Sequence, residues 1–324
     1  MDRVFVTRKL PQPGLDRLKE ECDIEVNPED RVLTKKELIK GIKGKDGLLC
    51  LLTDIIDKEI IDAEPNLKMI ANYAVGYNNI DIKYATQKGI PVSNTPEVLT
   101  ETTADMGWVL LFSAARRVVE GDRFTRAGKY KGWGPMLMLG QDVTGKTLGI
   151  IGTGRVGTAF ALKSKGFNMR VLYYDVKSNE PLEKELGAKK VSLEELLSES
   201  DFVSVHVPLI PATQHLIGEK ELKLMKKSAV LINTSRGPVV NEKILVKALK
   251  EKWIFAAGLD VYENEPQLEE GLADLENVVL APHLGSASVE TRTKMALIAV
   301  ENILAGLKGE VPPNCVNPEV FERK

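Results

Sequence analysis

The stretch KTLGIIGTGRVG, residues 146–157, decides the fold of this chain. An apolar run, TLGII, stands directly before the glycine pattern G-x-G-x-x-G, and a helical pattern, RVGTAFALKSKGF, follows it. The next apolar run, RVLYY, leads to Asp175, roughly 20 positions beyond the first glycine, where a carboxylate reaches the adenosine ribose of a dinucleotide. A strand, a glycine turn, a helix and a second strand ending in an acid together predict a dinucleotide-binding unit.

The residues of this motif each suit one part of the cofactor. Gly152 permits the tight turn, Gly154 lets the backbone approach the pyrophosphate, and amides at the helix start attract the phosphates. Asp175 accepts hydrogen bonds from both ribose hydroxyls of NAD and repels the extra phosphate of NADP, which predicts a preference for NADH. Lys177 could accept that phosphate, so use of NADPH stays open. The expected cofactor contacts in this region are Gly152, Thr153, Gly154, Arg155, Val156, Gly157, Asp175, Val176 and Lys177.

Short apolar runs rich in β-branched residues recur on both sides of the motif. Polar turns and helical patterns separate them, as in TKKELIKGIKG (34–44), where Thr34 and Glu37 form a capping-box pair. Continuous apolar strands that alternate with helices favour parallel sheets covered on both faces. We therefore expect an α/β protein with two Rossmann-like, doubly wound parallel-sheet domains separated by a cleft. The predicted strands are residues 3–8, 23–27, 46–52, 67–75, 91–95, 146–152, 170–175, 201–207, 228–234, 255–261 and 277–283.

The order of these elements predicts a discontinuous first domain. The early strands lack a final element, and a long helical pattern near the end of the chain can supply it by returning to them. We expect a substrate (catalytic) domain formed by 1–96 and 288–324, with an NAD-binding domain, 97–287, inserted between its parts. An amphipathic segment, 97–126, leads into the loop GKYKGWGPMLMLG (128–140), which is unusually apolar for an exposed connection. Such a loop covers a partner surface or folds onto its own domain, and both interpretations stay open here.

Composition and charge exclude several classes of protein. Lysine and arginine number 44 against 46 acidic residues, a net charge of −2, which offers no broad attraction for nucleic acid or anionic lipid. No apolar stretch reaches the ~18 residues of a membrane span, and no signal-peptide pattern opens the chain. Cys22, Cys50 and Cys315 stand at unrelated spacings, which indicates buried, reduced thiols. We expect a soluble, cytoplasmic protein without a bound metal.

The chain contains only three histidines, His206, His215 and His283. An enzyme that reduces a ketone with a nicotinamide cofactor needs a proton donor near neutral pH, and histidine suits that task best. His283, in APHLGS, ends a predicted strand, and ligands of open α/β sheets bind at the carboxyl ends of strands. His206, in VHVP, also lies near a strand end, so position alone leaves both as candidates.

Two further strand ends favour His283. NTSRGPVV (233–240) places Arg236 just past one strand, and GLDVYENEP (258–266) places Glu265 just past the next. Arginine offers a planar fork for a substrate carboxylate and polarises the adjacent carbonyl. A glutamate beside an imidazole stabilises the imidazolium form, which keeps the histidine protonated for reduction. Singly, Arg236 could be a surface ion-pair partner and Glu265 a turn residue. A guanidinium, a carboxylate and an imidazole on successive strand ends indicate a catalytic set.

The sequence resembles the D-isomer-specific 2-hydroxyacid dehydrogenase family, most of all its glyoxylate/hydroxypyruvate reductases. The resemblance runs through nearly the whole chain. It implies Arg236, Glu265 and His283 in the roles argued above, with Arg236 and His283 both contacting the substrate. It rests on ANYAVGYNNID (71–81), NTPEVLTETTADMGW (94–108), GTGRVG (152–157), HVPLIPATQHLIG (206–218), NTSRGPVVNE (233–242), DVYENEP (260–266) and PHLGSAS (282–288).

The resemblance also implies roles that the patterns alone do not assign. The backbone amides of Val75 and Gly76 would bind the substrate carboxylate, and Leu52 would lie at the pocket floor. Asp260 would orient the nicotinamide amide, which fixes the face that delivers hydride. Members of the family are homodimers paired through the segment that corresponds here to 97–140. The further cofactor contacts implied are Thr103, Pro208, Thr213, Thr234, Ser235, Asp260 and Gly285.

The same resemblance implies the reaction. The family reduces small 2-oxo acids, here glyoxylate and hydroxypyruvate, to glycolate and D-glycerate, with hydride from NAD(P)H and a proton from His283. Three alternatives share the architecture: the core of 3-phosphoglycerate dehydrogenase, D-lactate dehydrogenase, and NAD-sensing transcriptional corepressors that bind peptides. The short stretch after the last predicted helix leaves no room for the regulatory domain of many phosphoglycerate dehydrogenases. The complete Arg/Glu/His set argues against a corepressor, because function follows the site rather than the fold.

The chain departs from the family pattern at three places. Asn78 stands where the family usually has Asp after Gly-Tyr, and Thr153 replaces the usual apolar residue of the glycine motif. PMLML (135–139) carries Met and Leu where some relatives supply a tryptophan from the neighbouring subunit to the active site. These differences bear on substrate preference and not on the fold.

Overall fold

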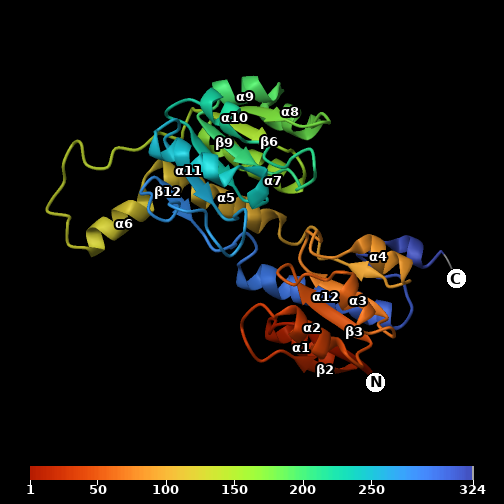
Figure 1. Cartoon of the computed structure of the whole chain (residues 1–324). Helices are drawn as coiled ribbons and strands as arrows, with labels where there is room; N and C mark the ends of the chain where they lie inside the picture. The colour runs from red at the N-terminus through yellow and green to blue at the C-terminus, as the bar shows by residue number, and fades with distance from the viewer. Residues whose placement is uncertain (323–324) are drawn as a thin grey trace. The chain divides into compact units, whose positions relative to one another are not determined.

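The structure, a computed structural model, describes residues 1–322, in which the chain leaves one α/β unit for a second and then returns. Unit 1 consists of Met1–Leu99 and the segment from Ala287 onward, and unit 2 is the continuous stretch Thr100–Ser286 (Figure 1). Each unit is built on one sheet whose named strands all pair in parallel, as the sequence predicts. Residues 323 and 324, the end of the predicted substrate domain, lie outside the described residues.

The described part of unit 2 contains a seven-stranded sheet in the order β12-β11-β10-β9-β6-β7-β8. The order reverses between β6 and β9, which is the arrangement that binds dinucleotides at the carboxyl ends of its strands. Every strand that the sequence predicts in this unit is present. The short strand β8 was not predicted, because it consists of two exposed lysines without an apolar pattern. The strands are β6 (Thr147–Ile151), β7 (Arg170–Tyr174), β8 (Lys189–Lys190), β9 (Phe202–Val205), β10 (Val230–Asn233), β11 (Ala256–Leu259) and β12 (Val278–Leu280).

Helices cover both faces of this sheet, which confirms the doubly wound prediction. One face packs against α5 (Thr100–Ala115), α7 (Arg155–Lys163) and α8 (Glu180–Leu186), and the other against α9 (Leu193–Glu199), α10 (Glu219–Leu224) and α11 (Glu242–Lys250). Two short 3₁₀ turns, η1 (Ser164–Phe167) and η2 (Gly237–Val239), also belong to this unit. On the first face the ring of Trp108 stacks on Phe160 at 5.0 Å between centroids, and its indole N–H donates to the Phe160 carbonyl. These aromatic contacts fix α5 and α7 together.

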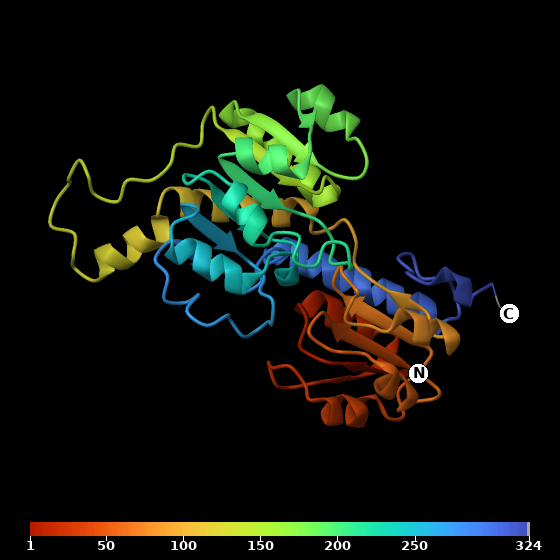
Figure 2. The ribbon, with the colours of Figure 1, turned by 45° about the horizontal axis from the view of Figure 1, so that its top comes forward.

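The segment predicted as one amphipathic stretch forms two helices. The chain bends between α5 and α6 (Val118–Arg126), where Arg117 adopts a left-handed backbone with φ 54°. No residue of α6 is buried, and this helix and the loop after it extend away from the sheet of unit 2 in both views (Figures 1 and 2). The side chains of Trp133 and Met136 in that loop are 83% and 76% exposed. The part of the loop around Trp133 and Met136 therefore does not fold onto its own unit, whereas its end at Leu139 and Gly140 returns to Ala115 and Arg117.

Unit 1 contains a five-stranded sheet in the order β2-β1-β3-β4-β5. Its strands are β1 (Asp2–Val6), β2 (Cys22–Val26), β3 (Gly47–Leu51), β4 (Met69–Tyr73) and β5 (Val92–Ser93). The helices are α1 (Gln12–Lys19) and α12 (Val289–Leu307) on one face, α2 (Lys35–Ile42), α3 (Lys58–Asp62) and α4 (Ile82–Gln87) on the other, and the 3₁₀ turn η3 (Pro318–Val320). From α12, Met295, Ala299 and Ile303 join Val4 and Leu49 in one core. The helix α12, which follows the inserted unit, thus completes the core on one face of the first sheet.

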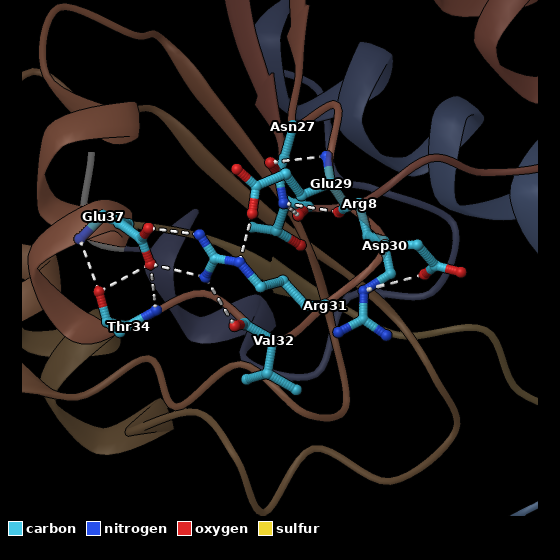
Figure 3. Close-up of polar contacts among 9 residues, drawn as sticks. Arg8, Asn27, Glu29, Asp30, Arg31, Val32, Thr34 and Glu37 are labelled. Atoms are coloured by element: carbon cyan, nitrogen blue, oxygen red, sulfur yellow. Dashed lines mark hydrogen bonds and ion pairs between the residues drawn. The ribbon is translucent and has the colours of Figure 1, made fainter.

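The predicted capping box at the start of α2 is confirmed (Figure 3). The Thr34 hydroxyl accepts the amide of Glu37, and the Glu37 carboxylate accepts the amide of Thr34 at 2.8 Å. Arg31 forks onto the same carboxylate at 2.6 and 2.9 Å and also pairs with Glu29. The Arg31 guanidinium and the Thr34 amide hold the pKa of Glu37 well below its usual range. The loop that enters α2 is therefore fixed by charge and by the helix cap.

The structure bears on two expectations from composition, the burial of the cysteines and the lack of a membrane-spanning segment. Cys22 and Cys50 are buried free thiols, as predicted. Cys315 is free but only half-buried, which corrects the prediction for this residue, because it lies in the irregular stretch after α12. Among residues 1–322, every helix is too short or too polar to cross a bilayer.

Candidate active site

The carboxyl ends of the strands of unit 2 lie along one edge of its sheet, and most of the predicted site residues follow them. Gly152 comes directly after β6, Asp175 after β7, Thr234 after β10 and Asp260 after β11. His283 stands three residues beyond β12. Because the strands are parallel, these positions share the edge where open α/β sheets bind ligands.

The glycine turn has the geometry that a dinucleotide needs. Gly152 has φ 92°, and a Cβ at Gly157 would lie 2.0 Å from the Gly152 carbonyl oxygen, so the turn depends on both glycines. Helix α7 begins at Arg155, followed by Val156, and its N-cap, Gly154, has no side chain to cap the first turn. Amides at an uncapped helix start attract an anion such as a pyrophosphate.

Asp175 reaches back to this turn. Its carboxylate accepts the Thr153 amide at 2.7 Å and the Thr153 hydroxyl at 3.1 Å. Burial acts to raise the pKa of Asp175, but hydrogen bonds from the amides of Thr153 and Lys177 hold it below the usual value. The carboxylate is therefore ionised beside the glycine turn. Val176 and Lys177, the next two residues, are exposed.

The other predicted cofactor residues of unit 2 form two groups. In the loop after β9, the Thr213 hydroxyl donates to the Pro208 carbonyl at 2.6 Å, which closes the loop on itself. After β10, the Ser235 amide and hydroxyl both donate to the Asn233 side chain at 3.0 Å. The neighbouring Thr234 hydroxyl is buried and has no hydrogen-bond partner in the described residues. A buried, unpaired hydroxyl beside the glycine-bearing edge suits a bound polar ligand.

Asp260 holds the turn that carries His283. Its two carboxylate oxygens accept the amides of Leu284 and Gly285 at 2.6 and 2.7 Å, and Thr103 packs against Gly285. Burial raises the pKa of Asp260. His283 itself has a left-handed backbone with φ 56°, an uncommon conformation that these two hydrogen bonds help to maintain.

Glu265 and His283 form a hydrogen-bonded pair across two successive strand ends. Oε2 of Glu265 lies 2.9 Å from Nδ1 of His283, and Oε1 accepts the Tyr262 amide at 2.9 Å. Burial acts to raise the pKa of Glu265, but the imidazole of His283, the Tyr262 amide and the charge of Arg236 hold it below the usual value. Glu265 is thus a carboxylate over the neutral pH range, placed to accept a hydrogen bond from Nδ1 of His283.

Arg236 belongs to the same edge. Burial lowers the pKa of this guanidinium, while the charge of Glu265 opposes that shift. Its Nη1 donates to the Ser235 carbonyl at 2.7 Å, and the Arg236 carbonyl accepts the Asn233 side-chain amide. Within the described residues the Arg236 side chain forms no direct ion pair, so it stays available for an anionic ligand.

The structure separates the two histidines that position alone left as candidates. Nε2 of His206 bonds to the Ser204 hydroxyl at 2.8 Å, and its ring packs on Phe160 behind the glycine turn. Burial lowers the pKa of His206 to about 3, so the ring is neutral near pH 7. A neutral ring cannot serve as a ready proton donor, whereas His283 is half-exposed beside a carboxylate.

The predicted substrate residues lie in unit 1, at the carboxyl ends of its own strands. Val75 and Gly76 follow β4, and the exposed Leu52 follows β3. The side chains of Asn94 and Asn72 donate to the carbonyls of Val75 and Gly76 at 2.7 and 2.9 Å. Among the described residues, the amides of Val75 and Gly76 donate no backbone hydrogen bond, which suits the binding of a carboxylate.

Several residues that shape the site were not singled out by the sequence. Asn72, Asn79 and Asn94 tie down the loops around the candidate carboxylate amides, and Asn79 bonds to the carbonyls of Leu51 and Asp54 at 3.0 Å each. In unit 2, Tyr262 anchors the Glu265 turn through its hydroxyl, which donates to the Ala281 carbonyl at 2.8 Å. The only available signal was the occurrence of asparagines near the ends of predicted strands 67–75 and 91–95 or shortly after them, a residue type that stabilises turns.

The described residues contain no group of three or more His, Cys, Asp and Glu side chains arranged to hold a metal ion. The candidate site of unit 2 is made of charged side chains and backbone amides. Its donor set is a guanidinium, an imidazole–carboxylate pair and backbone amides. This set can bind a small carboxylate and move one proton.

Residues 108–285 match the model of the NAD-binding domain of D-isomer specific 2-hydroxyacid dehydrogenases. Over 322 residues the chain is 56% identical to the glyoxylate reductase of Korarchaeum cryptofilum, a match that spans 99% of this chain and 97% of that protein. These similarities cover the glycine turn and all three strand ends that carry the charged residues.

Solved structures agree with this similarity. A protein from Thermus thermophilus is 46% identical, with a TM-score of 0.92 over 97% of this chain and 99% of that one. The NADPH-dependent glyoxylate/hydroxypyruvate reductase of Sinorhizobium meliloti, in complex with NADP and malonate, is 31% identical. Its TM-score is 0.85 over 99% of this chain and 98% of that one.

Proposed function

Because the chain belongs to the D-isomer specific 2-hydroxyacid dehydrogenase family, we propose that it reduces glyoxylate and hydroxypyruvate to glycolate and D-glycerate. The observation that carries this proposal is the 2.9 Å pair of Glu265 and His283, which shares an edge with Arg236 and the glycine turn. Those residues supply a proton donor and a carboxylate anchor, which is what reduction of a 2-oxo acid requires.

The substrate is held by its carboxylate. The Arg236 guanidinium offers a planar fork that matches a carboxylate and polarises the neighbouring carbonyl. In unit 1 the amides of Val75 and Gly76 provide further donors, with Leu52 as an apolar contact. Glyoxylate and hydroxypyruvate are small enough to be recognised mainly by this end of the molecule.

His283 donates the proton. Glu265 holds Nδ1, so the proton that passes to the carbonyl oxygen leaves from Nε2. As the oxygen gains negative charge, Arg236 stabilises it, and Glu265 stabilises the imidazolium before transfer. When bound, the reduced nicotinamide supplies the hydride that the carbonyl carbon receives.

NADH is the favoured cofactor in this proposal. The glycine turn and the uncapped start of α7 hold the pyrophosphate, and the ionised Asp175 faces the ribose hydroxyls. The extra phosphate of NADPH would meet that carboxylate at close range. The Sinorhizobium relative is NADPH-dependent, so cofactor choice can differ between similar chains. In this chain we base the preference for NADH over NADPH on Asp175, with Lys177 as the opposing charge.

Two copies of the chain pair through part of segment 97–140. Its first helix, α5, places Trp108, Leu110 and Leu111 in the core of its own unit, which leaves α6 and the following loop as the exposed part. Trp133 and Met136 in that loop present apolar surface that a second copy would cover. Light scattering of the purified chain tests this, with the double substitution Trp133→Ser and Met136→Ser expected to favour the monomer.

A substrate panel tests the proposed reaction. NADH consumption is followed with glyoxylate, hydroxypyruvate, pyruvate and phosphohydroxypyruvate side by side, and the first two should give the highest kcat/KM. Arg236→Lys should lower kcat/KM for both by roughly 10-fold or more, because an ammonium cannot present the same fork. Highest activity on phosphohydroxypyruvate or on pyruvate would replace the proposed substrates, and no turnover of any 2-oxo acid would refute the reaction.

A further inference from the structure

We propose that the side chains of His215, Glu242 and Glu263 form a clamp that positions Glu265 against His283 and ties it to the cofactor loop. The three are positioning residues for the reaction, because none of them is part of the proton-donating pair. This inference rests on the proposed function, since it concerns how the proposed pair is held. We refer to the three side chains as the 215–263 clamp.

Glu263 and Glu242 hold each other by hydrogen bonds in both directions. Oε1 of Glu263 lies 2.6 Å from Nε2 of His215, and Oε2 accepts the Glu242 amide at 3.2 Å. In return, the Glu263 amide donates to Oε1 of Glu242 at 2.8 Å. Glu263 therefore caps the start of α11 with its carboxylate while its own backbone is held by the first residue of that helix. The turn cannot shift without breaking all three contacts.

The clamp meets the proposed catalytic carboxylate at two adjacent peptide units. The amide of Tyr262 donates to Glu265 at 2.9 Å, and the next amide, that of Glu263, donates to Glu242. The backbone between residues 262 and 263 also lies against Gly237, where an added Cβ would stand 1.8 Å from the Tyr262 carbonyl carbon. This peptide adjoins the one whose Tyr262 amide holds Glu265, so a shift of the first is passed to that donor through Tyr262, beside the turn that carries Arg236.

The other end of the clamp belongs to the cofactor loop. The His215 amide donates to the Pro238 carbonyl at 2.8 Å, and Ile217 continues this pairing with Val239 at 3.1 Å. Thr213, a proposed cofactor contact, stands two residues before His215. The side chain of His215 thus joins the loop that carries Thr213 to the turn that carries Glu265.

Charge explains why a histidine suits this place. Glu242 is 2% exposed and forms no ion pair in the described residues. Burial raises the pKa of Glu242, and the nearby charge of Glu263 raises it further, against the Glu263 amide that lowers it. Two carboxylates in one clamp repel each other, and the His215 imidazole gives Glu263 a hydrogen-bond partner at 2.6 Å. His215 therefore contributes a specific contact to the clamp.

The test is a double-mutant cycle on the purified full chain. Glu263→Gln keeps the shape but removes the charge, and it should lower kcat for glyoxylate by roughly 10-fold, the scale of a small misplacement of a catalytic group. KM for NADH should change far less than kcat. In a Glu265→Gln background the same substitution should have no further effect, because the clamp acts through Glu265.

Glu219→Gln is the matched control, since Glu219 pairs with Lys223 at 2.7 Å on the exposed face of α10 and touches neither the turn nor the loop. It should leave kcat unchanged in both backgrounds. His215→Gln is the second variant, used if circular dichroism shows that Glu263→Gln is not folded. It should lower kcat in the native background and have no further effect in the Glu265→Gln background.

Two results would overturn the clamp: an unchanged kcat in the otherwise native chain, or an equal loss of kcat with and without Glu265. The second result would show a general structural effect that does not pass through the carboxylate. An unsubstituted chain that reduces no 2-oxo acid would instead refute the proposed function, and the clamp with it. An active chain with an additive cycle refutes the clamp alone.

Discussion

Nδ1 of His283 lies 2.9 Å from Oε2 of Glu265, and Nε2 of the same ring has no hydrogen bond among the described residues. The other carboxylate oxygen is held by the Tyr262 amide, so the ring is oriented by a group that is itself fixed. An imidazole held in this way exposes one nitrogen and keeps the other occupied, which sets the atom from which a proton leaves. The pair thereby combines orientation and electrostatic support in one contact.

Replacing His283 should affect turnover rather than cofactor binding. His283→Ala is expected to lower kcat by roughly 10²–10⁴, the range for loss of a general acid, with little change in the Kd for NADH. Steady-state kinetics and NADH fluorescence titration measure the two quantities. His206→Asn is the contrasting variant: it alters the packing behind the glycine turn, so its main effect should be on NADH affinity. A reversed pattern would move the proton donor to His206.

Removing the charge of Glu265 should shift the pH dependence of reduction. The lowered pKa of Glu265 keeps it ionised at neutral pH, so a negative charge lies beside the proposed proton donor. In Glu265→Gln that negative charge beside the proton donor is gone, so we expect the alkaline fall of kcat to move to lower pH. Profiles of kcat from about pH 5 to about pH 10 for both proteins, a range that spans the titration of an imidazole, measure the displacement. Superimposable alkaline limbs would speak against the pair.

Asp175 should set the ratio of kcat/KM with NADH to that with NADPH. Asp175→Ala removes the repulsion of the extra phosphate and the acceptor for the ribose hydroxyls, so the ratio should fall by roughly 10-fold or more. Lys177→Met tests the opposing charge and should reduce only the use of NADPH. Equal efficiencies with the two cofactors in the unsubstituted chain would mean that Asp175 does not face the ribose.

Thr34 should contribute to the stability of unit 1. Thr34→Ala removes the hydroxyl that caps α2, which costs about 1 kcal/mol of unfolding free energy. Urea unfolding followed by circular dichroism measures the change. Ser198→Ala serves as the control, because that exposed hydroxyl donates to a carbonyl within α9 and caps no helix start. Equal effects of the two substitutions would remove the capping contribution.

The fold was predictable because its strands are continuous apolar runs and its glycine motif fixes the strand–helix–strand order. Where the prediction failed, the apolar pattern was missing. The strand Lys189–Lys190 consists of two exposed lysines. The bend at Arg117 contains neither glycine nor proline, the residues that usually indicate a break between helices. Both features are set by neighbouring elements rather than by local preference.

The charged residues of the site were predictable as types at strand ends, but their contacts were not. The left-handed backbone of His283 and its support by Asp260 depend on hydrogen bonds between residues 24 and 25 positions apart in the sequence. The pairing of His215 with Glu263 joins residues 48 positions apart. No spacing rule predicts such contacts, because they arise only when neighbouring strand ends are brought together by the sheet.

The place of α12 in the core of unit 1 has a consequence for how the protein is made. During synthesis, residues 1–99 emerge from the ribosome long before Val289–Leu307, which supply Met295, Ala299 and Ile303 to the same core. The continuous unit 2 can complete its own core earlier, so we expect it to fold first. Until α12 is made, the strands of residues 1–99 have one apolar face that no helix covers fully. A nascent chain halted before α12 would therefore be the form most prone to aggregate or to recruit a chaperone.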